Sequence, residues 1–272
     1  MTQTLIIESG RTERQYWRDL WKFRELFYFL AWRDFLIRYK QTFVGIAWAL
    51  VRPLLMMLAL TMVGKFGKMP TGGAPYALFF FCGLLPWQFF ATAMSESGNS
   101  LVTNANLVSK IYFPRLVVPA SSVIVGFVDF LISAGFLVLL MLYYHFTPPP
   151  QIIFLPLFVA LIFAISMGIG FWIAALTVEY RDFKFVIPFI VQFGIFVSGV
   201  FPVPAHAAER WHLLFSLNPL VGIIDGFRWS LLGGGNVIHY REMALSFAVT
   251  VFFVISGLWY FRKMERTFAD VI

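Results

Sequence analysis

The chain has 272 residues, of which 60% are hydrophobic and only 13% are charged, and its formal net charge is +7. A typical soluble domain carries about 25% charged residues, and one or two soluble domains of this length could not bury so much apolar surface. This composition excludes a soluble globular protein, and no ten-residue alternating segments suggest a porin-like barrel, so we expect an all-α, polytopic membrane protein.

A polar, basic arm precedes the apolar part of the chain, and we assign residues 1–43 to it. Within it, Tyr28, Trp32, Phe35 and Tyr39 recur at helical spacing, so four aromatic rings share one helical face. An aromatic, basic and amphipathic helix is expected to lie in the headgroup plane of a membrane. The alternative is a helix packed on another cytoplasmic subunit, and both can hold at once.

Six apolar stretches follow the arm, and each has about the 20 residues that a helix needs to cross the hydrocarbon core. They lie near Val44–Val63, Tyr76–Met94, Leu116–Tyr144, Ile152–Val178, Phe185–Phe201 and Met243–Phe261. We therefore predict a six-span transmembrane domain over residues 44–262, followed by a tail over residues 263–272.

Positive charge alternates between the two sides of this predicted bundle. Most of the 21 Lys and Arg residues lie in the arm, in the loops after the second and fourth spans, and in the tail. Because cytoplasmic segments carry the excess of Lys and Arg, both termini are predicted to face the cytoplasm. Attraction to anionic lipid headgroups accounts for the basic net charge, so the charge implies no nucleic-acid partner.

Two segments differ from ordinary connections between spans. Residues 98–115 are polar and then basic, and we interpret them as a cytoplasmic segment in which Asn104 caps a short helix and Pro114 ends it. Residues 202–242 are broken by prolines and by a run of glycines into pieces too short to cross a bilayer. Re-entrant or interfacial half-helices fit this outer segment, provided that protein buries them or that they line a cavity.

Charged residues inside spans are candidates for function, because a bilayer disfavours them. Arg52 in the first span and Glu96 near the end of the second have similar depth, so they either pair or each extend to the interface. Asp129 lies deeper, and we expect a structural partner for it, such as Arg228. Asp225 and Arg228 are three residues apart on a predicted helix and can also satisfy each other.

Motifs for catalysis, metal binding and nucleotide binding are missing from the sequence. It has no GxSxG elbow, no HExxH-type motif and no GxxxxGK[ST] loop. The lone cysteine, Cys82, lies in a span and cannot form an intrachain disulfide. We therefore expect no enzyme active site, metal site or cofactor in this chain. If ATP drives the protein, a separate subunit binds Mg-ATP and hydrolyses it.

Aromatic residues are abundant, with 33 Phe, 10 Tyr and 9 Trp, and they crowd the second span beyond what an interfacial belt requires. Aromatic rings offer flat faces on which sugar rings can slide. Our candidates for the lining of a translocation pathway are Trp48, Phe79, Phe80, Trp87, Phe89 and Phe90. Core packing is the alternative for each single ring.

Several segments, taken in order, resemble a known family. They are RDFLIRYKQTFVGIAWALVRPL (Arg33–Leu54), GLLPW (Gly83–Trp87), NANLVSKIYFPR (Asn104–Arg115), AALTVEYRDFK (Ala174–Lys184), SLNPLVGIIDGFRWSLLG (Ser216–Gly233) and FADVI (Phe268–Ile272). This set is similar to the permease subunits of type-2 ABC exporters, and specifically to those that move O-antigen, capsular or teichoic-acid polysaccharides. The resemblance runs from about Glu25 to the last residue.

The resemblance implies six spans in the cytoplasmic (inner) membrane of a bacterium, and a homodimer that binds two copies of a separate ABC ATPase. It implies a lipid-linked polysaccharide as substrate. A pore wide enough for a glycan also favours a dimer, because six helices enclose only a narrow one. The residues that the analogy assigns to ATPase coupling are Arg33, Arg38, Asn104, Asn106, Lys110, Arg115, Glu179, Arg181 and Asp182.

The analogy also places Asp225 and Arg228 in an outer gate. Family members often have Ser-Pro at the end of the fifth span, whereas this chain has Ser198-Gly199. Three other functions stay open at this point. An ion-coupled secondary transporter would need ion ligands at mid-membrane, where Asp129 stands alone. A membrane-embedded glycosyl- or acyltransferase would need acid and base residues that are not evident, and an ABC exporter of lipid or drug would share this architecture.

Overall fold

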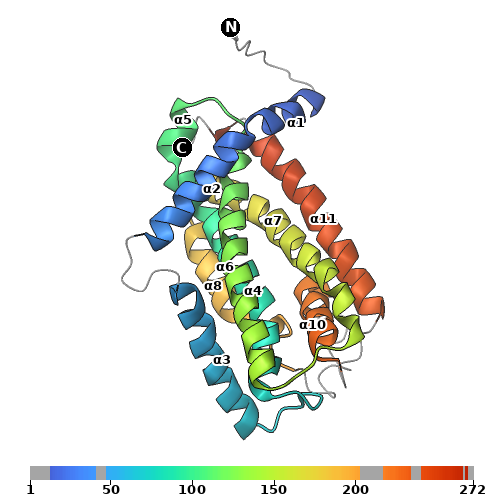
Figure 1. Ribbon diagram of the computed structural model, residues 1–272. Coiled ribbons are helices and arrows are strands. Elements are labelled where there is room, and N and C mark those ends of the chain that lie inside the picture. Colours follow the sequence, from blue (N-terminus) through green and yellow to red (C-terminus); the bar gives the residue numbers. More distant parts are fainter. Residues whose placement is uncertain (1–12, 41–46, 203–216, 234–239, 266, 269–272) are drawn as a thin grey trace.

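The computed structural model describes residues 13–40, 47–202, 217–233, 240–265 and 267–268 (Figure 1). Its elements in chain order are α1 (Glu13–Lys22), α2 (Arg24–Tyr39), α3 (Trp48–Phe66), α4 (Tyr76–Thr103), α5 (Ala105–Lys110), α6 (Val117–Tyr143), the 3-10 helix η2 (Pro150–Phe154), α7 (Leu155–Glu179), α8 (Phe183–Val197), α10 (Pro219–Leu232) and α11 (Tyr240–Met264). These described residues form helices and no strands, which confirms the all-α fold.

Five of the expected spans are helices long and apolar enough to cross a membrane: α3, α4, α6, α7 together with η2, and α11. The second is longer than predicted, because α4 continues past Met94 to Thr103. The expected span Phe185–Phe201 is instead the shorter apolar helix α8, which has 15 residues and ends at Val197. At 1.5 Å per residue, α8 is about 22 Å long, less than the roughly 30 Å of a hydrocarbon core.

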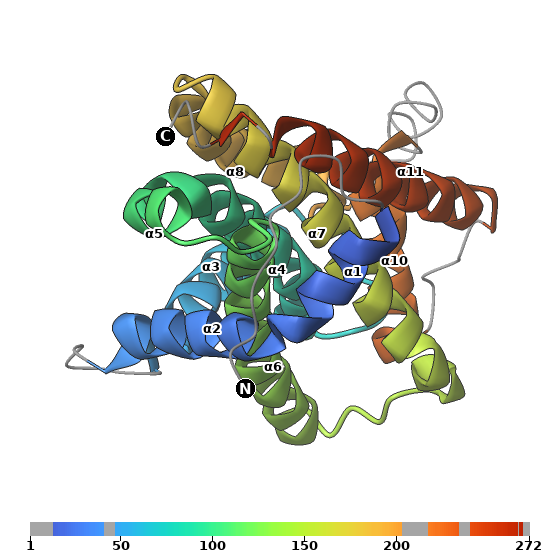
Figure 2. The same cartoon turned by 90° about the horizontal axis from the view of Figure 1, so that it is seen from above.

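Helix α4 forms the centre of the bundle. Of its most apolar window, 83% is buried, against 22% for α3 and α11 and 33% for α6 and α7. Helices α3, α6, α7, α8 and α10 all pack against it (Figure 2). Small residues such as Gly98 allow this packing, since a Cβ there would lie 2.7 Å from the side chains of Ile173 and Ile187. The outer helices present apolar side chains outward, as a protein solvated by lipid does.

Helices α7 and α11 approach so closely that their backbones touch. A Cβ on Gly168 would lie 2.8 Å from the backbone of Phe253, and one on Gly257 would lie 2.3 Å from the Gly168 carbonyl oxygen. Small residues at facing positions are a common means of packing membrane helices. Because backbone atoms form the contact, no side-chain rotation can relieve an added methyl group.

Replacing Gly168 with alanine is therefore expected to separate α7 from α11 and to lower stability by about 1–3 kcal/mol, the usual cost of overpacking. Gly135→Ala in α6 is the matched control, because nothing lies within 4 Å of a Cβ there. Thermal unfolding of both variants in detergent tests this. Equal midpoints for the two variants would contradict the proposed close approach.

Helices α1 and α2 lie across one end of the bundle, which we call the arm end (Figures 1 and 2). Leu30 of α2 is buried there in a cluster with Leu101, Phe261 and Phe268. The predicted aromatic face of α2 exists as a ladder of neighbouring rings, with centroid distances of 6.5, 5.7 and 4.9 Å from one ring to the next. The buried side of α2 fixes the arm to the bundle, while part of the ladder stays exposed.

Helix α10 is short and buried, as expected of a re-entrant half-helix within residues 202–242. Asn218 caps its first turn, because its side-chain oxygen accepts a hydrogen bond from the Leu220 amide at 3.1 Å. Gly233 ends it with a positive φ of 57°. Its 14 residues reach only about 21 Å. The remainder of the predicted segment, residues 203–216 and 234–239, lies outside the described residues.

Candidate functional site

Three charged side chains from three helices meet at the arm end. Arg38 of α2 lies 2.9 Å from Glu96 of α4 and 2.5 Å from Asp129 of α6, counted from guanidinium nitrogen to carboxylate oxygen. The Tyr39 hydroxyl also donates a hydrogen bond to Asp129. We call Arg38, Glu96 and Asp129 the charge cluster. It ties the amphipathic helix of the arm to two helices of the transmembrane bundle.

The structure lacks the pairing of Arg52 with Glu96 that was one of the two alternatives for these residues, and the expected pairing of Asp129 with Arg228 is wrong. Glu96 is paired with Arg38 rather than Arg52, and Asp129 is paired with Arg38 rather than Arg228. The physical reason is that α2 packs along α6, so a cation from outside the spans reaches both carboxylates. Burial alone lowers the pKa of Arg38, but the carboxylates of Glu96 and Asp129 raise it above its ordinary value overall. Arg38 is therefore a permanent cation.

A cavity of about 660 Å³ adjoins the charge cluster, and Arg52 of α3 also lines it. Its polar wall continues with the side chains of Gln88, Thr92 and Ser133, and Trp87 forms part of the apolar wall. A cavity of this size falls within the range of ligand sites in proteins. Among the described residues, no group of three His, Cys, Asp or Glu side chains could hold a metal ion.

A second polar contact joins the arm to the bundle. Arg33 of α2 donates a hydrogen bond of 2.7 Å to the side-chain oxygen of Asn104, which links α4 to α5. The Asn104 amide nitrogen donates to the Ser100 carbonyl at 2.8 Å. Asn104 is thus the N-cap residue of α5 as predicted, but its side chain makes no capping bond. Its contact with Arg33 couples α2 to the turn that carries α5.

Four of the predicted coupling residues are exposed at the arm end, in α5 and in the turn between α7 and α8. They are Asn106, Lys110, Arg181 and Asp182, and we call them the coupling surface. Tyr112, just after α5, and Tyr180, in the turn after α7, are also exposed. Glu179 is also exposed and accepts a 2.9 Å hydrogen bond from the Tyr260 hydroxyl. Charges of both signs beside exposed rings are suited to a protein partner.

Arg115 does not belong to this open surface. Its backbone amide donates a hydrogen bond of 2.7 Å to a carboxylate oxygen of Glu265, and its guanidinium donates to the Glu265 carbonyl. Burial raises the pKa of Glu265, although the Arg115 amide and nearby cations oppose the shift. We call this contact between the loop before α6 and the tail after α11 the tail clasp. Sequence reasoning missed Glu265, because no spacing connects residues 115 and 265.

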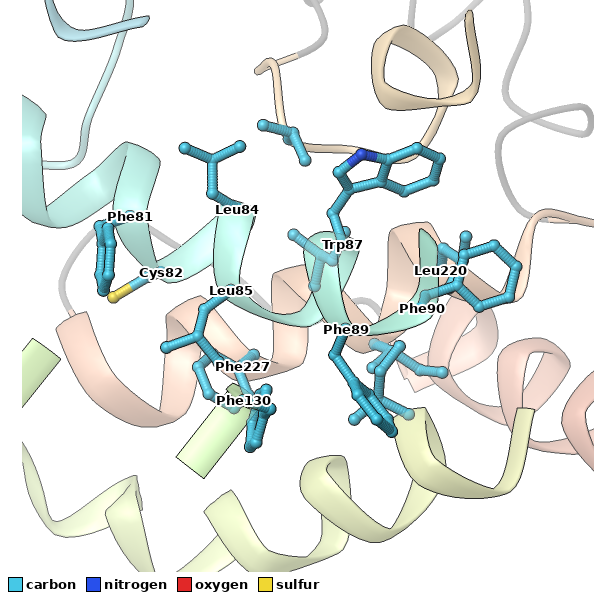
Figure 3. Close-up of a cluster of buried hydrophobic side chains, with 14 of the residues drawn as sticks. Phe81, Cys82, Leu84, Leu85, Trp87, Phe89, Phe90, Phe130, Leu220 and Phe227 are labelled. Atoms are coloured by element: carbon cyan, nitrogen blue, oxygen red, sulfur yellow. The ribbon is translucent and has the colours of Figure 1, made fainter. Parts of the chain in front are cut away.

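Five of the six aromatic candidates for a translocation pathway are buried in this structure, so their role in a pathway stays a prediction. Phe79, Phe80, Trp87, Phe89 and Phe90 are each at most 4% exposed and lie in the core around α4, where Figure 3 shows Trp87, Phe89 and Phe90. The ring of Phe89, for example, packs against those of three other phenylalanines at centroid distances between 5.6 and 6.2 Å. Only Trp87 and Phe89 of these five line the cavity. The side chain of Trp48 lies outside the described residues.

Helix α8 carries the accessible rings instead. Phe185, Phe189, Phe193 and Phe196 are all more than half exposed, and they recur at the spacing of one helical face. The rings of Phe189 and Phe193 are 4.5 Å apart between centroids. Sequence reasoning missed this stripe, although its spacing of four, four and three residues was the signal that could have found it.

Arg228 of α10 is buried in the protein and binds backbone rather than Asp129. It donates hydrogen bonds to the carbonyls of Gly199 at 2.6 Å, Val200 at 2.5 Å and Phe79 at 3.3 Å. Its guanidinium carbon also lies 4.1 Å from the centre of the Phe79 ring. The predicted pairing with Asp225 is present at 3.6 Å. Arg228 therefore holds the end of α8 and the first part of α4 together with α10.

The presence of Ser198-Gly199, where members of the resembled family often have Ser-Pro, has a local structural reason. Gly199 has a φ of +89°, which a proline cannot adopt. This conformation accompanies the bond from the Gly199 carbonyl to Arg228. A glycine at this position therefore suits the turn that ends α8.

Comparisons with a protein family and with individual relatives match most of this chain. A model of the ABC-2 type transporter family matches residues 25–232, which include α2, the charge cluster and Arg228. The O-antigen export system permease protein RfbA of Klebsiella pneumoniae is 24% identical over 241 residues, which cover 88% of this chain and 92% of that protein. The protein of the same name from Myxococcus xanthus is 26% identical over 266 residues, covering 94% and 98%. The chain therefore belongs to the ABC-2 type transporter family and is a multi-pass membrane transport permease.

Proposed function

We propose that this chain is the permease of an ATP-driven exporter of lipid-linked polysaccharide, of O-antigen, capsule or teichoic-acid type. It acts as a homodimer with two copies of a separate ABC ATPase, which binds Mg-ATP, in the cytoplasmic membrane of a bacterium. The single observation that carries the coupling mechanism is the double attachment of α2, through Arg33 to Asn104 and through Arg38 to Glu96 and Asp129. The names of the two relatives support the class of cargo.

In this mechanism the ATPase binds the arm end, at the coupling surface. ATP draws the two ATPase subunits together, and they push on α5 and α2. The push reaches the transmembrane bundle at two points, at the α4–α5 turn and at the charge cluster, so α4 and α6 move with the arm. The two permease halves then switch as rigid bodies between discrete packings. The exposed aromatic stripe of α8 supplies the rings that contact the sugar chain.

An ion-coupled secondary transporter is the second candidate, and the geometry gives it less support. Asp129 is the carboxylate that would have to bind a coupling ion or proton at depth. Its two oxygens are already occupied by Arg38 and by the Tyr39 hydroxyl. Export that survives ATP depletion but stops with a protonophore would favour this candidate.

The proposal is tested by the substitution Lys110→Glu on the coupling surface. Lys110 is exposed, so the variant should insert and accumulate like the wild type, and ATP hydrolysis by the complex should continue. Surface polysaccharide should fall at least fivefold, because the reversed charge disturbs the contact through which the ATPase moves the permease. The readout is surface polysaccharide in cells that lack their chromosomal copy of this gene.

Lys65→Glu is the matched control for this experiment, because Lys65 ends α3 at the opposite end of the bundle. It should export like the wild type. Export by Lys110→Glu at the wild-type level would refute the coupling role of this surface. Uphill transport by the purified chain in vesicles without any ATPase would refute the proposed function as a whole.

A further inference from the structure

The cavity beside the charge cluster is lined by two guanidinium groups and two carboxylates, but the ion pairing is unequal. Arg38 binds both Glu96 and Asp129. Arg52 lines the same cavity. No carboxylate of the described residues, however, forms an ion pair with it. Each of the four groups comes from a different helix, α2, α3, α4 and α6. One cation is therefore shared by two anions, while a second cation is held close to them.

The N-terminal end of α3, which carries Arg52, has an interrupted helical hydrogen-bond ladder. Pro53 follows inside the helix and has no amide hydrogen to bond the Ala49 carbonyl, so the helical ladder is interrupted there. The Ser133 hydroxyl of α6 lies 3.5 Å from that carbonyl. Only 22% of the most apolar window of α3 is buried. Proline is a common site of sharp helix kinks, so Pro53 is the position at which α3 can bend.

Movement of α2 would leave two carboxylates without their cation. The Asp129 side chain is only 22% exposed, and an unpaired charge at such a position is strongly disfavoured. A motion that separated Arg38 from Asp129 with no replacement would therefore be opposed by this cost. The cost falls if another cation of the same cavity takes the place of Arg38 during the motion.

We propose that Arg38 and Arg52 are alternating counter-ions of Glu96 and Asp129. The structure holds the state in which Arg38 on the arm binds both carboxylates. When the ATPase displaces α2, the N-terminal end of α3 bends at Pro53 and Arg52 binds the two carboxylates instead. This inference rests on the proposed function, since it needs an ATPase that moves α2. Arg52 is thus a positioning residue that makes the second state accessible and touches no cargo.

The test is the substitution Arg52→Gln in the complex with its ATPase. Because Arg52 forms no ion pair with the part of the chain that the structure describes, the thermal midpoint of the nucleotide-free permease should match the wild type. Surface polysaccharide should fall at least fivefold, since the second state lacks a counter-ion. Arg52→Lys, which keeps a cation beside the same carboxylates, should export within about twofold of the wild type.

Lys65→Gln is the control, as it removes one charge from the other end of α3. Export by Arg52→Lys, together with loss of export by Arg52→Met, which fills similar space without a charge, separates the switch from a merely structural role of Arg52. Wild-type export by Arg52→Gln, or an Arg52→Lys variant that exports no better than Arg52→Gln, would overturn the inference while leaving the proposed function intact. Absence of ATP-dependent export by the wild-type complex would instead refute the proposed function.

Discussion

Replacement of Arg228 with methionine is expected to leave little folded permease in the membrane. The side chain is 2% exposed and donates hydrogen bonds to three backbone carbonyls, those of Phe79, Gly199 and Val200. Methionine fills similar space but donates no hydrogen bond. The three backbone carbonyls would therefore lose their donor. Because an unpaired polar group is poorly tolerated away from water, the stability loss should be about 3–5 kcal/mol, as when a buried pair is broken.

The measurement is the yield of monodisperse permease in detergent and its thermal midpoint. Arg228→Lys should have a midpoint between those of the wild type and Arg228→Met. Its ammonium group keeps the charge, but it lacks the fork geometry with which a guanidinium reaches all three carbonyls at once. Lys184→Met is the matched control, since Lys184 is exposed at the start of α8. An Arg228→Met protein with the wild-type midpoint would show that the three carbonyls find other donors.

The helices and their membrane class were predictable because hydropathy and length depend on local sequence alone. Helix α8 shows the limit of that reasoning, since the apolar run Phe185–Phe201 is long enough to span. The turn at Gly199, which points its carbonyl at Arg228 in α10, ends the helix earlier. A contact between residues 29 positions apart decided where α8 ends, and no local pattern contains it.

The charged residues of the site could be predicted from the sequence, but their ion-pair partners could not. Arg52, Glu96 and Asp129 were identifiable because a bilayer disfavours charge wherever it occurs. Their pairing depends on where α2 lies against the bundle, and Arg38 stands 91 residues before Asp129. The burial of the aromatic candidates was hidden from the sequence for a related reason. Abundance of rings in α4 reflected its central position, and only the packing shows that Phe80 is fully buried.

The tail clasp leads to a second large effect. Arg115→Glu should destabilise the arm end, although the sequence alone assigned Arg115 to the ATPase contact. The guanidinium now donates to the Glu265 carbonyl, and the substitution would place a second carboxylate beside one that is already largely buried. Loss of a charged hydrogen bond and the added repulsion should together lower stability by about 2–4 kcal/mol. Lys110→Glu, close by but exposed, should leave the thermal midpoint unchanged.

Glu265→Gln separates the charge of the clasp from its hydrogen bond. Burial raises the pKa of Glu265, so this carboxyl contributes stability that is fully present below its ordinary pKa of about 4.3 and is lost as pH rises through the folded pKa. Glutamine keeps the acceptor for the Arg115 amide and has no charge to bury. The midpoint of the variant should therefore equal or exceed that of the wild type at pH 7, with the difference shrinking as pH falls.

Thermal unfolding of the wild type and of Glu265→Gln across pH 4–8 provides the measurement. Glu179→Gln is the control, because Glu179 is an exposed carboxylate at the same end. The double variant Arg115→Glu, Glu265→Gln tests the repulsion within the clasp, since glutamine keeps an acceptor for the residue-115 amide but carries no charge, and it should recover part of the loss caused by Arg115→Glu. Had Arg115 bound the ATPase instead, the second substitution would restore neither stability nor export. A wild-type midpoint for Arg115→Glu accompanied by lost export would return Arg115 to the coupling surface.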